Sequence, residues 1–411
     1  MEGVMKAVSF KYNVPQYLLT GLLDRRWQKV LFTRLAPVRL RDVPEPDLPG
    51  DDWVKIRPRL SGLCGSDMSI ILCHESLTLQ PFASYPFVLG HEVCGEIVEK
   101  GPGAEGVDPG DRVVVNPMLG CLPRGVDPPC DFCARGQTQL CVNFTEGRLA
   151  AGTIIGATAG VPGFLSECGV AHLSQLFPVP EGLSDEAAVI TDPFANGIHM
   201  ARVNPVSPGE TVVVVGCGVM GLCALAALGA LHPGARLLAV ESDPHNARLA
   251  RDLGAEEVLS PPFDRTFYRK VADLTGARMH TPLLSKPLLI GGPERVFDTV
   301  GSTDTIEMSL RVLANAGWFN LLGIGAPKRI DWTPVWLKEL TLRGMYGYEV
   351  TPGTCDGEHD YQVALRLHAE GKVDLAPLVT HRFALSEWPR ALEVALDKGR
   401  HHAVKIALRP K

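Results

Sequence analysis

The chain has 411 residues, of which 45% are hydrophobic and 21% charged, and its formal net charge is −6 at pH 7. The length allows two domains of ordinary globular composition. The acidic balance, without a long run of Lys or Arg, argues against nucleic acid and against an anionic membrane as partners.

The first part of the chain, to about residue 190, is predicted to be rich in short strands. Gly, Pro and Asp clusters separate its apolar runs, which are Trp53–Ile56, Phe87–Leu89, Glu96–Val98 and Arg112–Val115. Residues 15–35 contain an amphipathic piece without an assigned role. The N-terminus has no apolar core of a secretory signal, so we expect the eleven cysteines to serve metal binding in a reducing compartment, the cytoplasm.

From Glu210 the pattern changes to alternating strands and helices, which predicts a doubly wound parallel sheet. The clearest helix cap is Asp243, with Pro244 at the first helical position and Gly254 at the end. An insertion is expected within 265–293. The predicted strands are 211–215, 236–241, 257–259, 295–300, 318–323 and 341–346, and the predicted helices are 219–231, 244–253 and 305–314.

The tail is predicted to contain helices at 361–370 and 388–398 and a closing strand at 403–408 that returns to the first domain.

One alternative concerns the stretch Thr211 to Leu231, which has no charged residue and is long enough for a membrane span. Its three glycines and the lack of a second span favour a buried strand–turn–helix unit.

A dinucleotide site is predicted at this turn. Gly216, Gly218 and Gly221 have the spacing that lets a pyrophosphate approach the backbone, and the first amides of the helix, at Val219 and Met220, would face it. Glu241 stands twenty residues after the last glycine, where an acidic side chain binds the ribose hydroxyls. A carboxylate there repels a 2′-phosphate, so NAD is favoured over NADP. The alternative is an exposed charge at a strand end.

Metal ligands are predicted in two segments of the first part, SGLCGSDMS (61–69) and LGHEVCG (89–95). Cys64, His91 and Glu92 offer a thiolate, an imidazole and a carboxylate, which are zinc ligand types. Taken singly, Cys64 could be a small buried side chain and His91 a turn histidine. Asp192, in the segment TDPFANGIHMA, could complete a ligand set.

The ordered motifs CGSD, GHEVCGE, GDRVVV, a four-cysteine loop, DPF and the glycine-rich turn resemble the zinc-dependent medium-chain dehydrogenase/reductase family, which includes alcohol, sorbitol and threonine dehydrogenases. The resemblance covers most of the chain. It implies an α/β protein with a β-rich GroES-like catalytic domain, residues 1–194 completed by 350–411, and a Rossmann NAD-binding domain, residues 195–349.

The resemblance also implies site residues. Cys64, His91 and Asp192 match the family's catalytic zinc ligands, and Glu92 matches a nearby carboxylate that can also bind the metal. The implied reaction is hydride transfer between a secondary alcohol or polyol, or the matching carbonyl, and NAD.

Two further catalytic residues follow from the same match. Ser66 matches the hydroxyl that takes the substrate proton, and Asp67 matches a carboxylate that orients His91. Many relatives carry a relay histidine where this chain has Ser69, so proton exit is expected through water or through His74.

A structural zinc site is the second implied metal centre. Cys130, Cys133 and Cys141 keep the family spacing, and Cys121 fits the first ligand position with an inserted segment after it. The alternative is a set of metal-free thiols.

Several alternatives for function stay open. A threonine-type 3-hydroxy amino acid dehydrogenase is the nearest, and a nucleotide-binding homologue without turnover belongs to another class. A zinc-free quinone or enone reductase is disfavoured by the ligand residues. A small-molecule substrate and a homodimer or homotetramer are expected, the latter by analogy with the family.

Overall fold

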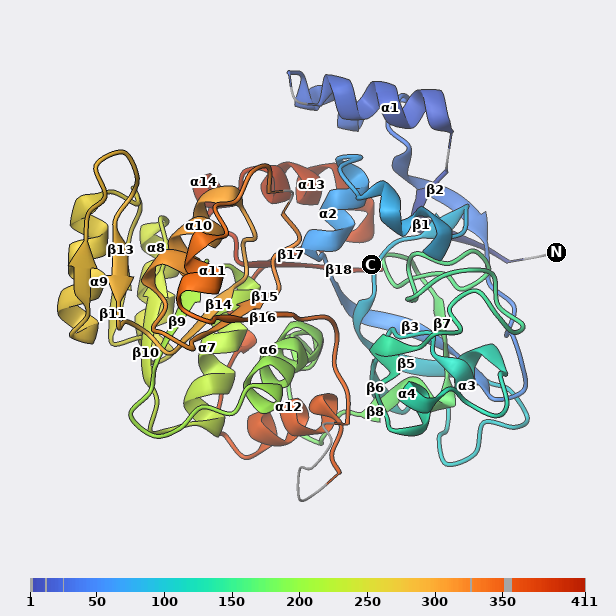
Figure 1. Ribbon diagram of the computed structural model, residues 1–411. Helices are drawn as coiled ribbons and strands as arrows, with labels where there is room; N and C mark the ends of the chain where they lie inside the picture. The colour runs from blue at the N-terminus through green and yellow to red at the C-terminus, as the bar shows by residue number, and fades with distance from the viewer. Residues whose placement is uncertain (1–2, 12, 25, 326, 351–356, 411) are drawn as a thin grey trace. The chain divides into compact units, whose positions relative to one another are not determined.

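The computed structural model describes residues 3–11, 13–24, 26–325, 327–350 and 357–410 (Figure 1). The chain forms two compact units, which are Met1–Asp192 with Tyr348–Lys411, and Pro193–Gly347. The sequence places the domain boundaries at 194/195 and 349/350, and these boundaries stay a prediction. The catalytic role of one part and the cofactor-binding role of the other also stay predictions. Among the helices of the described residues, none is both long and apolar enough to cross a bilayer.

The unit Pro193–Gly347 is built on a six-stranded parallel sheet with the strand order β11-β10-β9-β14-β15-β16. Along the chain this is the order 3-2-1-4-5-6, which defines a doubly wound Rossmann sheet. The strands are β9 (Thr211–Val215), β10 (Arg236–Val240), β11 (Glu257–Leu259), β14 (Arg295–Asp298), β15 (Trp318–Leu321) and β16 (Thr341–Gly344). The uncharged stretch Thr211 to Leu231 is therefore β9, the glycine turn and a helix, and not a membrane span.

Both faces of this sheet are covered, as continuous apolar strands require. Val213 and Val215 of β9 belong to the apolar core that includes residues of α9 and α10, and the alternate residues Val212 and Val214 are also buried. Helices α7 and α8 contact β10. The helices are α6 (Thr191–Val203, which begins at the unit boundary), α7 (Val219–Leu231), α8 (Pro244–Asp252), α9 (Arg265–Thr275), α10 (Thr303–Val312) and α11 (Thr333–Leu337).

Local chemistry explains where these elements begin and end. Asp243 caps α8 by accepting hydrogen bonds from the amides of His245 and Asn246, as predicted. Strand β14 ends two residues earlier than predicted, because the Asp298 carboxylate accepts bonds from the amides of Val300 and Gly301 and turns the chain. The segment 265–293, expected to hold an insertion, forms α9 and a hairpin of β12 (Arg278–His280) and β13 (Leu288–Ile290).

The unit Met1–Asp192 with Tyr348–Lys411 contains two sheets. The smaller has the order β2-β1-β4, and the larger has the order β17-β18-β3-β5-β6-β8 with β7 beside β3. The strands are β1 (Val4–Phe10), β2 (Val38–Pro44), β3 (Trp53–Gly62), β4 (Phe87–Val88), β5 (Glu92–Lys100), β6 (Arg112–Val115), β7 (Gly169–His172), β8 (Leu176–Pro178), β17 (Val379–Ala384) and β18 (Lys405–Arg409).

Short helices join these strands. They are α1 (Val14–Leu23), α2 (Gly65–Ile71), α3 (Cys121–Arg124), α4 (Asp131–Ala134), α5 (Asp185–Val189), α12 (Asp360–Ala369), α13 (Trp388–Leu396) and α14 (Lys398–His401), with 3-10 turns that include η1 (Gln28–Phe32) and η2 (Leu77–Phe82). The run predicted at 96–98 is the middle of β5, which begins four residues earlier, at Glu92.

Strand β3 organises the larger sheet. Its end residue Gly62 pairs with Glu92 at the start of β5 and with Ala407 of β18. Its buried residues Trp53 and Ile56 pack in one apolar core with residues of β5 and β6. This register places the end of β3 between the start of β5 and the strand β18, and the candidate metal ligands lie at that point.

The amphipathic piece near the N-terminus forms α1 and η1, between two strands that pair directly with each other. The Asn13 side chain caps α1 by accepting a bond from the amide of Gln16 at 3.1 Å. Thr20 donates to the carbonyl of Leu35 at 3.1 Å, and the ring of Tyr17 packs edge-on against Phe10. The segment is thus a folded connection between β1 and β2.

Candidate active site

Cys64 is positioned by the start of α2. It is the N-cap residue of this helix, and the Asp67 carboxylate reaches back so that Oδ2 accepts a hydrogen bond from the Cys64 amide at 2.9 Å. The other oxygen, Oδ1, lies 3.3 Å from the amide nitrogen of Gly90 and accepts from it. One buried carboxylate therefore ties the cysteine segment to the histidine segment.

His91 and Glu92 follow a turn that requires glycine. Gly90 has φ +95°, and a Cβ on it would lie 2.5 Å from the backbone nitrogen of Leu165. The turn leads directly into β5, so the pairing of Glu92 with Gly62 fixes both side chains near the end of β3. The ligand atoms of Cys64, His91 and Glu92 lie within 4.8 Å of one another.

The charges around this cluster suit a cation. Burial opposes a charge on the His91 imidazole, but Asp67 and Cys64 raise its pKa well above the ordinary value. The Asp67 Oδ1 atom lies 3.7 Å from His91 Nδ1. A thiolate, an imidazole and a carboxylate gathered at this spacing are a donor set that fits Zn²⁺.

Lys405 is a member of the site that the sequence analysis missed. Its ammonium forms an ion pair with the Glu92 carboxylate, and both side chains are 1% exposed. Burial opposes the charge of Lys405, but Glu92 and then Cys64 raise its pKa. The only local signal is a lysine in the middle of an apolar closing strand, and its partner lies more than 300 residues earlier in the sequence.

Asp192 lies outside the three-residue group. Its Oδ2 atom accepts hydrogen bonds from the hydroxyls of Tyr348, at 2.5 Å, and Tyr361, at 2.6 Å. Burial raises the pKa of Asp192, and the nearby Glu92 raises it further. The two tyrosines were not singled out from the sequence, and no local pattern links them to this carboxylate.

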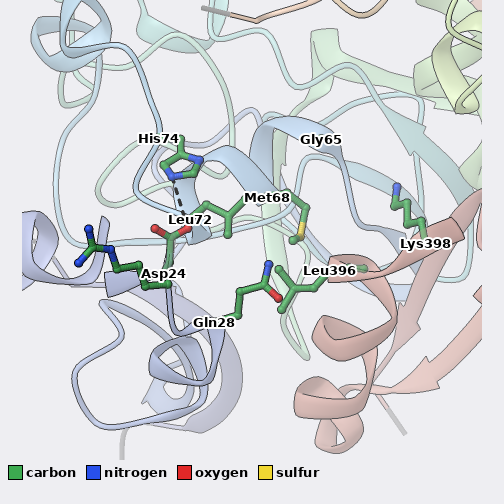
Figure 2. Close-up of a pocket in the computed structure, with 10 residues that line it drawn as sticks. Asp24, Gln28, Gly65, Met68, Leu72, His74, Leu396 and Lys398 are labelled. Carbon is green, nitrogen blue, oxygen red and sulfur yellow. Dashed lines mark ion pairs between the residues drawn. The ribbon is translucent and has the colours of Figure 1, made fainter. Parts of the chain in front are cut away.

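The residues expected to handle protons lie on and after α2. Ser66 is in the first turn of the helix, two residues beyond Cys64. His74 follows α2, and its Nε2 atom lies 3.3 Å from Oδ2 of the buried Asp24 (Figure 2). The structure therefore gives His74 an acidic partner from the N-terminal segment.

Glu75, next to His74, gives a testable dependence of stability on pH. Burial, and then the charge of Asp67, raises the pKa of Glu75 to about 7. Between pH 4.5 and about 7 the Glu75 carboxyl is therefore protonated in the folded chain and ionised in the unfolded chain. The free energy of unfolding consequently falls as pH rises through this range.

We expect Glu75→Gln to stabilise the protein at pH 8 by roughly 1–3 kcal/mol, and little at pH 4. Urea unfolding at the two pH values measures this. The matched control is Glu105→Gln, because Glu105 is exposed. Equal effects of the two substitutions at pH 8 would contradict the expectation.

The four cysteines of the loop come together as a second cluster. The sulfurs of Cys121, Cys130, Cys133 and Cys141 lie within 4.8 Å of one another, and those of Cys121 and Cys141 are 3.7 Å apart. A tetrahedron with Zn–S bonds of about 2.3 Å has sulfur edges of about 3.8 Å. The cluster therefore has the size of a four-thiolate zinc site.

Backbone amides support negative charge on these sulfurs. The amide of Cys130 donates to Cys121 Sγ at 3.3 Å, and the amide of Asn143 donates to Cys141 Sγ at 3.3 Å. Every cysteine of the described residues is a free thiol, and Cys355 lies outside them. Such donors favour the thiolate form, which is the form that binds metal.

The glycine turn after β9 has the backbone demanded by its sequence. Gly216 has φ +83°, and a Cβ on Gly221 would lie 1.8 Å from the carbonyl oxygen of Gly216. A Cβ on Gly218 would meet nothing within 4 Å. The chain itself therefore does not require glycine at 218, and the open space in front of the first amides of α7 fits a phosphate group.

Glu241 holds this turn in place. Its Oε2 atom accepts from the amide of Cys217 at 2.7 Å, and Oε1 accepts from the amides of Ser242 at 2.7 Å and Asp243 at 2.8 Å. The side chain is thus an organised group and not a free charge at a strand end. Oε2 retains one acceptor position for a ligand hydroxyl.

Comparisons with known proteins agree with this architecture. Residues 50–181 match the family described as alcohol dehydrogenase GroES-like domain, and residues 218–370 match zinc-binding dehydrogenase. An L-threonine 3-dehydrogenase from Francisella tularensis is 30% identical over 357 residues, which cover 86% of this chain and 92% of that protein. The chain belongs to the zinc-dependent medium-chain dehydrogenase/reductase family. It is a zinc-type oxidoreductase of that family.

Solved structures of two proteins show the same family fold. The 2R,3R-butanediol dehydrogenase of Bacillus subtilis has a TM-score of 0.74 at 24% identity, covering 99% of this chain and 100% of that one. A protein from Sinorhizobium meliloti 1021 with NADP bound has a TM-score of 0.73 at 23% identity, and the match covers 100% of each chain. The predicted combination of a GroES-like and a Rossmann fold is confirmed.

Proposed function

We propose that the protein is an NAD-dependent dehydrogenase of a secondary alcohol or polyol, or a reductase of the matching carbonyl. The observation that carries the proposal is the gathering of Cys64, His91 and Glu92 within 4.8 Å. A binding protein without turnover has no need of such a buried donor set, whereas a zinc oxidoreductase depends on it.

In this proposal Cys64 and His91 hold the catalytic zinc, and Glu92 or Asp192 supplies the carboxylate. Glu92 lies in the cluster but is paired with Lys405, and Asp192 is held by two tyrosines. Zinc held by these residues would supply Lewis-acid polarisation of the substrate oxygen, and a dinucleotide bound at the glycine turn would supply the hydride chemistry. Ser66 takes the substrate proton.

Asp67 acts in this scheme by positioning. Its carboxylate binds the amides of Cys64 and Gly90 and lies beside His91, so the two ligand segments keep a fixed separation. Carboxylates of this kind orient a histidine ligand and raise its basicity.

NAD is the proposed cofactor, bound at the turn of Gly216, Gly218 and Gly221 and at the first amides of α7, Val219 and Met220. The open space at Gly218 and the remaining acceptor position of Glu241 support this site. One relative of the same fold was solved with NADP, so the choice between the two dinucleotides rests on the negative charge of Glu241.

Replacing Glu241 with glutamine tests that choice. We expect the ratio of kcat/KM for NADP to that for NAD to rise about tenfold or more, because repulsion of the 2′-phosphate is removed. Steady-state kinetics with both dinucleotides measures the ratio. Glu257→Gln, on the neighbouring strand β11, is the control, and an unchanged ratio in Glu241→Gln would argue against NAD preference.

A threonine-type 3-hydroxy amino acid dehydrogenase is the second candidate. The observation in its favour is the 30% identity to an L-threonine 3-dehydrogenase, together with the segment Asp192-Pro193-Phe194. The zinc-loaded protein should be assayed with NAD against secondary alcohols, polyols and L-threonine. Formation of NADH with L-threonine, and with none of the secondary alcohols or polyols, would favour this candidate.

The same assay tests the alternative of another class, a nucleotide-binding homologue without turnover. Tight NADH binding by the zinc-loaded protein with no oxidation of any compound in the panel would favour that alternative. Protein that binds no zinc would overturn the zinc-dependent proposal itself.

A structural zinc on Cys121, Cys130, Cys133 and Cys141 is also proposed, as is a reducing compartment, the cytoplasm. The 3.7 Å sulfur separation and the free thiols support these two points.

A homodimer or homotetramer is proposed as the assembly. Strand β16 is the edge of the six-stranded sheet, and all four of its residues are exposed. An exposed edge strand offers unpaired backbone groups to another chain. Light scattering of the purified protein measures the assembly, and a monomer at all concentrations would overturn it.

A further inference from the structure

Two adjacent residues, Tyr348 and Glu349, lie between the four-cysteine loop and Asp192. On the loop side, the Glu349 carboxylate accepts hydrogen bonds at Oε2 from the side-chain amides of Gln137, at 3.0 Å, and Gln139, at 2.7 Å. On the other side, the Tyr348 hydroxyl donates to Asp192 Oδ2 at 2.5 Å. A short piece of chain therefore contacts both the loop and a candidate carboxylate ligand.

The contacts on the loop side are buried and close. Glu349 is 3% exposed and Gln139 is 4% exposed. The amide of Val350 donates to the carbonyl of Gly136 at 3.2 Å, and a Cβ on Gly136 would lie 2.8 Å from the Cβ of Val350. The loop residues that make these contacts all lie between the third and fourth cysteines of the cluster, so the fold of the cluster fixes their positions.

Glu349 is a buried carboxylate with neutral partners on the loop. Within the residues that the structure describes, no Lys, Arg or His pairs with it. Its backbone is fixed by Asp360, whose Oδ2 atom accepts from the Glu349 amide at 2.8 Å. Burial of a carboxylate is costly unless hydrogen-bond donors compensate for the lost water. The two glutamine amides therefore stabilise this one arrangement of the loop against Glu349.

The Asp192 carboxylate is held at a defined rotation. The hydroxyls of Tyr348 and Tyr361 both bind the same oxygen, Oδ2, which fixes the direction of Oδ1. The Tyr361 hydroxyl oxygen also lies 3.1 Å from the carbonyl oxygen of Val115, at the end of β6. Because β6 is antiparallel to β5, this end lies beside the start of β5, where Glu92 stands. The hydrogen bonds thus place the Asp192 carboxylate next to the strand that carries a candidate ligand.

We propose that the four-cysteine loop positions Asp192 for metal binding, through Glu349 and Tyr348. The ordered loop fixes the two glutamine amides, and these fix Glu349. The adjacent tyrosine then holds Asp192 as the carboxylate ligand of the catalytic zinc. Glu349 is in this scheme a positioning residue that acts through Tyr348. The inference rests on the proposed function, in which the chain binds zinc at Cys64 and His91.

Zinc release from the full-length, zinc-loaded protein to a chromophoric chelator tests the proposal without turnover. The release step that is missing in Cys64→Ala belongs to the catalytic centre. We expect Tyr348→Phe to accelerate this step about tenfold or more, and Glu349→Met about fivefold or more, because loss of supporting hydrogen bonds weakens metal binding. The double variant should stay within about twofold of Tyr348→Phe, since both substitutions break one connection.

The matched control is Glu146→Met, because Glu146 follows the fourth cysteine and is exposed. It should change the catalytic release step by less than about twofold. Gln139→Met removes the 2.7 Å donor on the loop side, so it should also accelerate this step, even if Glu349→Met does not fold.

Three results would overturn the proposal. One is an unchanged catalytic release step in Tyr348→Phe. Another is that the effects of Tyr348→Phe and Glu349→Met multiply in the double variant, which would show that they act independently. The third is equal acceleration of both zinc release steps in Tyr348→Phe, which would indicate a general loss of stability. Absence of any release step that depends on Cys64 would instead overturn the proposed function, and this inference with it.

Discussion

Cys64→Ala is expected to lower the zinc content by one ion per chain and to reduce kcat by roughly a thousandfold or more. The cysteine is the only thiolate of the Cys64, His91, Glu92 group, and its loss leaves an imidazole and a carboxylate that is already paired with Lys405. Two ligands do not hold zinc against water and chelators. Elemental analysis of dialysed protein and steady-state kinetics measure the two effects.

The matched control is Cys168→Ala, because Cys168 is a buried free thiol that belongs to neither cysteine cluster. It should keep wild-type zinc content and kcat. If Cys64→Ala keeps full zinc and full activity, the proposed catalytic centre is wrong. Loss of activity at unchanged zinc content would mean that the metal is held elsewhere and that Cys64 acts in another way.

Cys133→Ser is expected to remove the other zinc and to lower the thermal midpoint by about 10 °C or more, with a smaller effect on kcat at low temperature. The four sulfurs join α3, α4 and the loop after them, and this segment has few other buried apolar groups. Metal binding at such a site would contribute directly to the folding free energy. Calorimetric unfolding with and without a chelator measures the effect.

For this cluster the control is Cys168→Ser, which places the same hydroxyl in a buried site without the metal geometry. We expect it to cost about 1–3 kcal/mol and to respond little to the chelator. Equal chelator responses in wild type and Cys133→Ser would show that the thiols carry no metal, which was the alternative reading of the loop.

The sequence by itself determined the features that depend on neighbouring residues. The order TVVVVGCGVMG specifies a strand, a left-handed turn at Gly216 and a helix, because glycine adopts φ +83° without the strain that a Cβ would bring. The Asp243-Pro244 pair specifies the start of α8. The ordered motifs also identify the family, since each retains a candidate ligand or a turn residue at a local spacing.

Only the tertiary structure decided which distant groups meet. Glu92 is paired with Lys405, and Asp192 with Tyr361, across separations that no periodicity encodes. The register of β3 against β5 and β18 sets these partners, and it depends on the packing of the whole sheet.

The N-terminal segment that forms α1 and η1 is a second case in which the sequence does not reveal the contacts. Its amphipathic pattern predicts a helix but not the surface on which the segment packs, because the core that contains Val30 and Leu31 also includes residues of α2 and α13. The pairing of Asp24 with His74 therefore appears only in three dimensions. Local propensity and capping act over a few residues, whereas the ion pairs depend on chain segments brought together by folding.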